Sequence, residues 1–520
     1  MSTTYLILLI LLIVYIPFYI YVRMSPAMKE RGIVPYGPFV MFKTKRGIQY
    51  LDKAAKYKRF WNAFGTVSKI LALFLMLMIM FIIIVDILLL PRMMDTSGIG
   101  VEYALALPGI NPMLPLIPGV IGLVIAVAIH EIAHGIQTRA NDMTVESTGL
   151  LYAVVPIGAF VEPNDEQLKK CSRKPRSDVF AAGIAINVIV AIVIFFVMTF
   201  GMMSAISPAY ENDAGVTNVY AGSPADDSGI VFSSLILKID DGSTVTEVTY
   251  DKLMEYPFTV SPLGIPAKKY TVTYLTPDGP KYTEMYMGVF MYGIAKGSPA
   301  DKEEIPRNSF LVSIGGAEIT TIDSFRDAMG SFSPGDDVTV EYKTYKNGVL
   351  TDGSKNVTLG NNNGTAFLGV NYSLSGFAFT KSDDVLAKAK NPFHGVNSLM
   401  DVPSAALSYI GKPFGGYDPI PSELQWWYSS SVLSDNTFWT VLQVTFWIFW
   451  LNLVLAVTNA LPAVPFDGGY LFRDGVGAIV DRTHKNADSE KKEKITNTVT
   501  TVVSYIMLGA LLLIMMAIIL

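Results

Sequence analysis

Apolar residues along the chain follow two contrasting patterns. Six stretches are apolar over about 20 residues, the length that an α-helix needs to cross a bilayer. They cover approximately residues 4–22, 67–90, 117–137, 178–203, 438–458 and 499–520. Residues 204–437 instead contain short alternating runs separated by PDG, GG and NG turns, which is typical of β-strands. The pattern predicts a polytopic α-helical membrane protein of about six transmembrane helices with a separately folded β-rich insert.

The composition supports a membrane protein and narrows the classes of site. Of the 520 residues, 51% are hydrophobic and 16% are charged, and the mean hydropathy is +0.38, which is too apolar for an ordinary soluble protein of this length. The net charge of −5 leaves no basic surplus, so we expect no nucleic-acid partner. Cys171 is the single cysteine, which excludes an intrachain disulfide and a cysteine-based zinc site.

The distribution of Lys and Arg predicts the orientation in the membrane. Residues 23–66 carry ten basic residues against Glu30 and Asp52, and basic loops of this kind stay in the cytoplasm. Alternation from there places loops 138–177 and 459–498 in the cytoplasm as well. The amino terminus and the acidic insert then lie outside. We therefore expect a multi-pass protein of the plasma membrane with an extracytoplasmic insert.

The insert contains a repeated string. GSPAD occurs at 222–226 and again 75 residues later, at 297–301, and each copy leads into an apolar strand and a turn. This repeat indicates two copies of one small module, and it resembles the PDZ domains of membrane-associated proteases. We predict PDZ domains at 205–290 and 291–372, of which the first is interrupted by residues 254–269. A PDZ groove would bind an extended peptide or a carboxyl terminus as an added strand. The alternative is a β-sandwich with coincidental repeats.

The remainder of the insert, residues 373–437, is predicted to be an extracytoplasmic linker. Residues 391–411 favour an amphipathic helix on the outer membrane surface. The aromatic cluster Trp426–Trp427–Tyr428 is interpreted as an interfacial belt, because such side chains prefer the headgroup level of a bilayer.

The third apolar stretch ends in AVAIHEIAHGIQTRA, which contains an H-E-x-x-H motif. His130 and His134 lie four residues apart on one helical face, so both side chains can ligate one metal ion, with Glu131 within reach of a water molecule there. The alternative is two buried histidines that are satisfied by hydrogen bonds. Inside a bilayer, however, uncompensated polar groups are costly, and this cost favours a metal partner. Counted along the helix, the site lies roughly 20 Å from the outer face, in the cytoplasmic half.

Two histidines leave a catalytic zinc ion one protein ligand short. His394 and His484 lie in polar stretches and are interpreted as surface residues. Asp467, in NALPAVPFDGGYLF directly after the fifth apolar stretch, is the better candidate, since two prolines there prevent a regular helix and two glycines allow close approach of the backbone. On composition alone, an ordinary cytoplasmic loop explains this segment equally well.

HEIAHG together with N-x-x-P-x-x-P-x-D-G-G resembles the site-2 protease family of intramembrane zinc metalloproteases. The resemblance covers about residues 117–475 and leaves the first two apolar stretches outside; one departure is Phe466, where the family usually has leucine. It implies one catalytic Zn²⁺ held by His130, His134 and Asp467, with Glu131 as the catalytic residue that transfers the proton of the attacking water. The residues that it assigns to substrate binding are Gly158 and Phe160 in PIGAFVEP, Gly183 and Asn187 in the G-x-x-x-N element, and Asn459, with Asn452 a weaker candidate.

The apolar stretches and the resemblance together predict the division of the chain, and the resemblance implies its partners. The predicted parts outside the insert are an amino-terminal two-helix region at 1–110, protease core helices at 111–204, and a third part at 438–520 that brings the aspartate ligand. The expected partner is a membrane protein whose transmembrane helix unwinds before cleavage, in contact with the lipid bilayer. Residues 149–163 alternate like a strand and could offer an edge to this substrate. Three alternatives remain: an inactive adaptor, a zinc transporter and a peptide-binding scaffold. The asparagines could equally make helix–helix hydrogen bonds.

Overall fold

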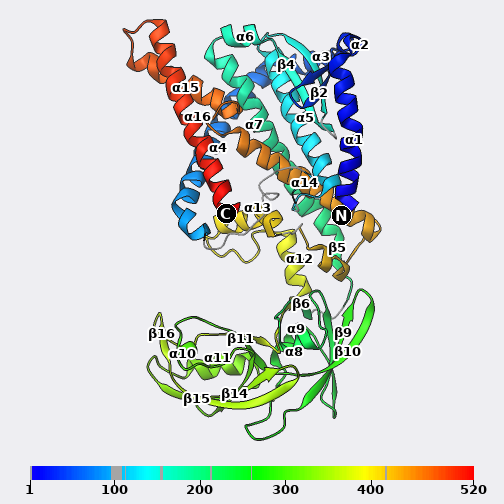
Figure 1. Cartoon of the computed structure of the whole chain (residues 1–520), viewed down its shortest axis with the longest axis vertical. Coiled ribbons are helices and arrows are strands. Elements are labelled where there is room, and N and C mark those ends of the chain that lie inside the picture. The colour runs from blue at the N-terminus through cyan, green and yellow to red at the C-terminus, as the bar shows by residue number, and fades with distance from the viewer. Residues whose placement is uncertain are drawn as a thin grey trace. The chain divides into compact units, whose positions relative to one another are not determined.

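The computed structural model describes residues 3–94, 108–109, 111, 113–152, 156–210, 214–258, 260–415 and 419–519. The chain divides into two compact units. The helical unit comprises residues 1–202, 407–419 and 436–520, and the β-rich unit comprises residues 203–406 and 420–435. Figure 1 shows the helices of the first unit and the long strands of the second. The predicted boundary at residue 110 lies outside the described residues.

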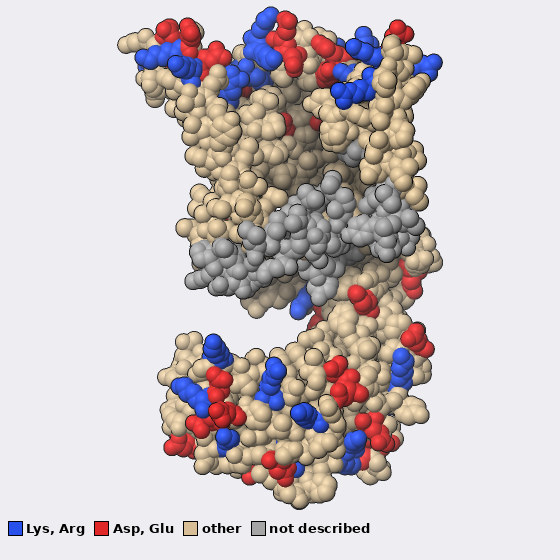
Figure 2. All heavy atoms as spheres, viewed as in Figure 1, with Lys and Arg blue, Asp and Glu red and all other residues tan. Residues whose placement is uncertain are grey.

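Five helices in the described part of the chain are long and apolar enough to span a membrane. They are α4 (Lys58–Met94), α5 (Leu116–Ala140), α7 (Arg173–Phe196), α14 (Asp435–Asn459) and α16 (Ser489–Ile519). The first predicted stretch forms α1 (Thr3–Met24), whose described apolar part, Leu12–Met24, is shorter than a full span. Helices thus occupy all six predicted stretches, and in the described part of the chain five of them meet the length and apolarity of a membrane span. On the face drawn in Figure 2, charged side chains gather at one end of the helical unit, and the flanks below are largely uncharged.

The membrane helices pack closely through small residues. α7 lies against both α5 and α4, and α16 lies against α4. Side chains of α4, of α7, and of α14 with the residue that follows it form one buried cluster, made of Ala72, Leu75, Ala181, Ile184, Val188, Ala456 and Ala460. Small residues allow helix backbones to approach closely, which is the main source of packing energy between helices in lipid. The cluster fixes α7 between the helices that surround it.

A four-stranded sheet joins two segments that are far apart in sequence. Its order is β1 (Ile33–Tyr36), β2 (Phe39–Thr44), β3 (Val145–Tyr152) and β4 (Pro156–Pro163), all antiparallel. Lys43 of β2 forms an ion pair of 2.9 Å with Glu162 of β4, and Ser147 of β3 donates a hydrogen bond to the same carboxylate. Burial raises the pKa of Glu162, but the hydrogen bonds from Ser147 and Lys43 outweigh it and hold that pKa below its usual value. Residues 153–155, between β3 and β4 in sequence, lie outside the described residues.

The rest of the helical unit consists of shorter elements around these spans. They are α2 (Pro26–Glu30), α3 (Ile48–Ala55), α6 (Asp165–Lys170), the π-helical turn Val197–Met202 that continues α7, and α15 (Asp467–Thr483). α3 packs on α5, and α15 packs on both α7 and α16. Seven residues, 460–466, connect α14 to α15 and bring the chain back to α7.

The β-rich unit is built on one twelve-stranded sheet. Its main path is β10-β9-β7-β6-β19-β18-β11-β12-β14-β15, and β8 and β13 pair beside it. The strands are β6 (Ala214–Val219), β7 (Leu235–Asp240), β8 (Val245–Glu247), β9 (Lys269–Thr276), β10 (Gly279–Tyr286), β11 (Val289–Ile294), β12 (Ser309–Ile314), β13 (Ala317–Glu318), β14 (Asp337–Lys346), β15 (Val349–Thr358), β18 (Val370–Leu374) and β19 (Phe377–Lys381). Separate apolar cores lie against its two halves, one built mainly from residues 214–287 and the other from residues 289–368.

The two GSPAD strings form matching turns. Ser223 caps α8 (Pro224–Asp227) by accepting a hydrogen bond from the Asp226 amide, and Ser298 caps α10 (Pro299–Lys302) in the same way. A positive-φ glycine packs against each serine, Gly376 against the first and Gly369 against the second. The repeat in sequence is therefore a repeat in structure. Whether the modules are PDZ domains stays a prediction.

The last strand of the first module follows the second module in sequence. β19 pairs with β6, the first strand of that module, while the sheet strands that precede it, β11 to β15 and β18, belong to the other half of the sheet. The second module is thus inserted into the first. A division at residue 372 cuts through β18 and separates β19 from the first module. The segment from 373 begins with the end of β18, followed by β19 and α12 (Ser382–Lys390) before α13 (Val402–Ile410).

The aromatic cluster of this segment is part of the protein interior, which corrects the interpretation as an interfacial belt. Trp427 and Tyr428 are only 1% and 2% exposed. The Trp427 indole N–H donates to the carbonyl of Ser233 at 2.6 Å, and the Tyr428 hydroxyl donates to the carbonyl of Ser382 at 2.8 Å. The six-membered ring of Trp427 covers Gly215 of β6, where any side chain would collide with it. The cluster anchors the β-rich unit.

We expect Trp427→Ala to lower the free energy of unfolding of the β-rich unit by about 3–5 kcal/mol, the usual cost of emptying a buried aromatic site. Chemical denaturation of the full chain in detergent, followed by circular dichroism in the β-sheet region, measures this loss. Trp426→Ala is the matched control, because Trp426 is only half-buried; it should cost about 1 kcal/mol. Equal losses for the two variants would contradict the anchoring role of Trp427.

Candidate active site

The H-E-x-x-H residues lie on α5, which begins after Pro115 and ends at Ala140. His130 and His134 are 5% and 8% exposed and face α7, with their rings 4.6 Å apart. Gly183 of α7 makes this approach possible, since a Cβ atom there would lie 2.5 Å from Nε2 of His134 and 2.7 Å from Cε1 of His130. Gly183 therefore acts by leaving room for the two imidazoles.

Asp467 is brought to the histidines by a break between two helices. α14 ends at Asn459, the next residues form irregular turns, and α15 begins at Asp467 itself. Gly468 and Gly469 pack directly on the backbone of this turn, where a Cβ atom at either position would lie 2.4 Å from a carbonyl carbon of residue 460 or 463. The two glycines thus allow the start of α15 to fold back tightly, which places the carboxylate in the protein interior.

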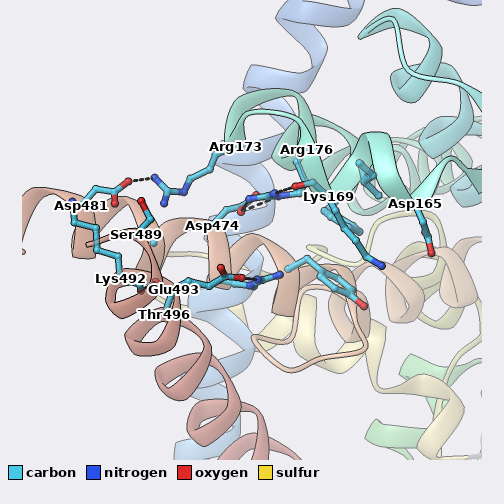
Figure 3. Close-up of a pocket in the computed structure, with 15 residues that line it drawn as sticks. Asp165, Lys169, Arg173, Arg176, Asp474, Asp481, Ser489, Lys492, Glu493 and Thr496 are labelled. Carbon is cyan, nitrogen blue, oxygen red and sulfur yellow. Dashed lines mark hydrogen bonds and ion pairs between the residues drawn. The ribbon is translucent and has the colours of Figure 1, made fainter. Parts of the chain in front are cut away.

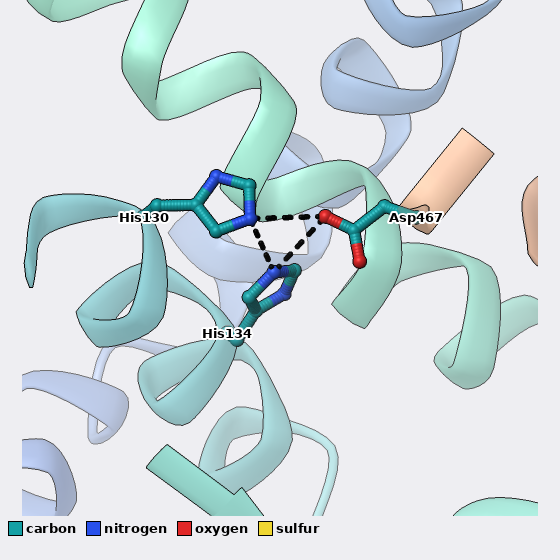
Figure 4. Close-up of side chains that lie close together, drawn as sticks. All are labelled: His130, His134 and Asp467. Atoms are coloured by element: carbon teal, nitrogen blue, oxygen red, sulfur yellow. Dashed lines mark hydrogen bonds and ion pairs between the residues drawn. The ribbon is translucent and has the colours of Figure 1, made fainter. Parts of the chain in front are cut away.

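The three side chains converge on one point (Figure 4). Nε2 of His130 and Nε2 of His134 lie 3.0 Å apart, and Oδ2 of Asp467 lies 3.0 Å from the first and 3.2 Å from the second. Within the described part of the chain, this is the group of His, Cys, Asp and Glu side chains whose ligand atoms are close enough to share a metal ion. Tetrahedral zinc with bonds of about 2.0–2.1 Å separates neighbouring ligand atoms by about 3.3 Å, so the triangle has the size of one face of such a site.

The hydrogen bonds around the triangle also fit a metal. Nδ1 of His134 lies 2.8 Å from the carbonyl oxygen of Val179. A carbonyl can only accept, so Nδ1 carries the proton and Nε2 of the neutral ring keeps its lone pair toward the triangle. Oδ2 of Asp467 is buried and has no hydrogen-bond partner of good geometry among the described residues. Two imidazole nitrogens and an unsatisfied carboxylate oxygen at these distances form a donor set that suits Zn²⁺.

Glu131 lies beside the triangle and is bound to the edge of the four-stranded sheet. Its Oε2 accepts a hydrogen bond of 3.0 Å from the backbone amide of Val161 in β4. Gly158, also in β4, packs on Val127 of α5, where a Cβ atom would lie 2.7 Å from a Val127 methyl carbon. Phe160 lies between them in sequence and pairs with Gly149 of β3. β4 therefore runs along α5 next to the H-E-x-x-H motif.

The predicted asparagines and the two remaining histidines differ in their contacts with the triangle. Asn187 is fully buried, with its amide nitrogen 3.4 Å from Nδ1 of His130. Asn459 and Asn452 both donate to carbonyls of their own helix, four residues earlier. Asn187 therefore contacts the site through His130, whereas the side chains of the two asparagines of α14 are hydrogen-bonded within their own helix. His394 and His484 are exposed, as expected for surface residues.

A pocket of about 900 Å³ lies between α6, α7, α15 and α16 (Figure 3). Its walls include two ion pairs between α7 and α15, Arg176 with Asp474 and Arg173 with Asp481. Its lining also contains the stacked rings of Phe180 and Tyr470, whose centroids lie 4.5 Å apart. Each ring is three residues from a residue of the site, Gly183 and Asp467 respectively. The largely buried pair of Arg176 and Asp474 therefore fixes α15, and with it Asp467, against α7.

Sequence reasoning missed two of these features. The Val179 carbonyl is a backbone group, and any residue type could supply it. Asp474 and Arg176 are ordinary charged residues nearly 300 positions apart, and nothing in their local sequence marks them as partners. The segment around Asp467 differs from these two features, because its proline and glycine content gave a local sequence signal for irregular backbone.

Comparison with known proteins identifies relatives. The family model described as peptidase family M50 matches residues 118–507. An uncharacterized protein of Methanocaldococcus jannaschii is 33% identical over 192 residues, which cover 36% of this chain and 50% of that protein. The match thus spans about half the length of this relative. The family match includes all three residues of the triangle and begins after α4.

Proposed function

Because the chain belongs to peptidase family M50, the site-2 protease family, we propose that it hydrolyses peptide bonds within or near the transmembrane segments of other membrane proteins. Family membership and five apolar helices make it a membrane-associated metalloprotease. The observation that carries the intramembrane proposal is the buried triangle of His130, His134 and Asp467 on helices of the membrane unit, with Glu131 beside it.

The proposed chemistry assigns one role to each group. Zinc, when bound by the triangle, supplies a Lewis acid that activates water and polarises the scissile carbonyl. Glu131 accepts the proton of the attacking water and passes it to the leaving amine. The Val161 amide orients the Glu131 carboxylate, and the Val179 carbonyl holds His134 in the tautomer that binds metal. His130 and His134 are buried, which limits bulk water around these two ligands and strengthens their interactions.

The edge of β4 supports a model for substrate binding. Among the described residues β4 pairs with β3 on one side only. The Val161 amide points to Glu131, so it marks the other edge, and strand alternation directs the Ala159 amide to that edge as well. An unwound substrate segment can add there as a further strand, with Gly158 and Phe160 beside it. A regular helix cannot pair in this way, so we expect cleavable substrates to contain helix-breaking residues.

The β-rich unit is proposed to select or present substrates. Its duplicated module is consistent with tandem PDZ domains, which would bind an extended segment or a carboxyl terminus, for example one left by an earlier cut. Its acidic character and the basic loops of the helical unit favour an extracytoplasmic position at the plasma membrane, with the metal site in the cytoplasmic half.

Metal analysis combined with a cleavage assay tests the proposal. We expect the purified full chain to contain one zinc ion and to cleave a model transmembrane segment that carries a central Gly-Pro helix breaker. A zinc chelator should reduce cleavage at least about 100-fold, because the chemistry requires the Lewis acid, and added zinc should restore it. The same segment with leucines in place of the breaker is the control and should resist. Chelator-resistant cleavage, or a zinc-loaded chain that cuts neither segment, would contradict the proposal.

A further inference from the structure

A buried carboxylate that the proposed chemistry does not use lies next to the metal site. Asp178 of α7 is 0% exposed. Its charge partner is Lys69 of α4, whose Nζ lies 2.5 Å from Oδ1 of Asp178. A buried charge is tolerated only where it is paired, so Lys69 and Asp178 hold α4 and α7 together at this point.

The pair acts on a backbone group of the site. Asp178 directly precedes Val179, whose carbonyl oxygen accepts the hydrogen bond from Nδ1 of His134. The Val179 carbonyl belongs to the next peptide unit in the same turn of α7, so an ion pair that fixes Asp178 against α4 also restrains the turn that carries this carbonyl. The position of this carbonyl, and so the orientation of the His134 ring, therefore depends on where Lys69 holds Asp178.

α4 also contacts α5, the helix that carries the histidines. The Gln137 side-chain amide of α5 donates to the backbone carbonyl of Trp61 in α4 at 3.2 Å. One turn further, Gly65 lies so close to both partners that a Cβ atom there would be 2.7 Å from Cγ of Asp178 and 2.8 Å from Nε2 of Gln137. α4 is thus in direct contact with polar side chains on each of the two helices that hold and orient His134.

We propose that Lys69 and Asp178 are positioning residues for the metal site and that α4, although outside the family match at 118–507, is a working part of that site. Through the Val179 carbonyl, the pair sets the orientation of His134 toward the metal. This inference rests on the metal site of the proposed function, but it does not require that the chain cleaves peptides. Groups that hydrogen-bond directly to a metal ligand typically change metal affinity 10–100-fold, and the pair acts one step further out through the Val179 carbonyl, so we expect the lower end of this range.

Zinc affinity of the full chain in detergent, measured by competition with a chromophoric chelator, tests the proposal without any cleavage assay. Lys69→Met should weaken zinc binding about 10-fold, and Lys69→Arg should restore it because a guanidinium can pair with the same carboxylate. Lys58→Met is the matched control. Lys58 is also on α4 and forms an ion pair with Asp142, but both partners are exposed; its loss should leave zinc affinity unchanged.

The double variant Lys69→Met/Asp178→Asn separates positioning from stability, because it leaves no unpaired buried charge. We expect its metal-free form to melt close to the wild-type temperature while zinc binding remains about 10-fold weaker. Wild-type zinc affinity in this variant would overturn the proposal and reduce the pair to a structural contact. If the wild-type chain binds zinc but cuts no substrate, the proposed function fails, and the effect of Lys69 on zinc affinity still decides this one.

Discussion

Glu131→Gln should abolish proteolysis while the chain keeps its zinc and its fold. Glutamine has the shape of glutamate and can still accept the hydrogen bond from the Val161 amide, but it cannot take up the proton of the attacking water. Loss of a general acid–base group typically costs 10²–10⁴-fold in rate. Because Glu131 is outside the three-ligand triangle, zinc content should not change. Cleavage of the helix-breaker segment under saturating substrate, together with metal analysis of the same sample, measures both effects.

Glu162→Gln is the matched control for this experiment. Glu162 follows Val161 in β4 and makes its contacts with Lys43 and Ser147, away from the metal triangle. The same chemical change there should alter the cleavage rate by less than about 10-fold, since no proton transfer depends on it. If Glu131→Gln cleaved at the wild-type rate, an adaptor or scaffold function would explain the chain better than proteolysis.

Much of the helical unit could be predicted from the sequence because its signals are local. The long apolar run of α5 predicts a helix that spans the bilayer, and the i, i+4 spacing of His130 and His134 places both side chains on one face of it. Asp467 is different. Its segment permitted an ordinary loop, and the choice of this residue came from the family resemblance. The structure brings its carboxylate to the two imidazoles by means of the glycines that follow it.

Features that depend on partners distant in sequence gave no local signal. The basic segment after α1 predicts only an orientation in the membrane, from its charge. In the structure its two strands, β1 and β2, extend the sheet of β3 and β4, with Val40 opposite Tyr152. The same holds for β19, which pairs with β6 across the whole second module. Tertiary contacts can also overturn the location that a residue type suggests. Trp427 looks like an interfacial residue by type, but Gly215 provides the space that buries it.

Asp467→Ala should remove zinc from the purified chain and, with it, all activity. The carboxylate is the only anionic member of the triangle, and without it the metal keeps two neutral imidazoles from α5. Residues that merely orient a ligand change affinity 10–100-fold, so loss of the ligand itself should weaken binding at least about 100-fold. The chelator competition used for Lys69 measures this change on the same scale, which allows the ligand and the positioning pair to be ranked directly.

Asp481→Ala controls for the loss of a carboxylate from α15. Asp481 lies on the same helix and pairs with Arg173 at 2.5 Å, but both side chains are more than 40% exposed, so the pair should contribute no more than about 1 kcal/mol and zinc affinity should stay at the wild-type value. A chain that bound zinc equally well with alanine at 467 and at 481 would place the metal elsewhere. The close approach of the three side chains would then need another cause, and Glu131 would have no activated water to deprotonate.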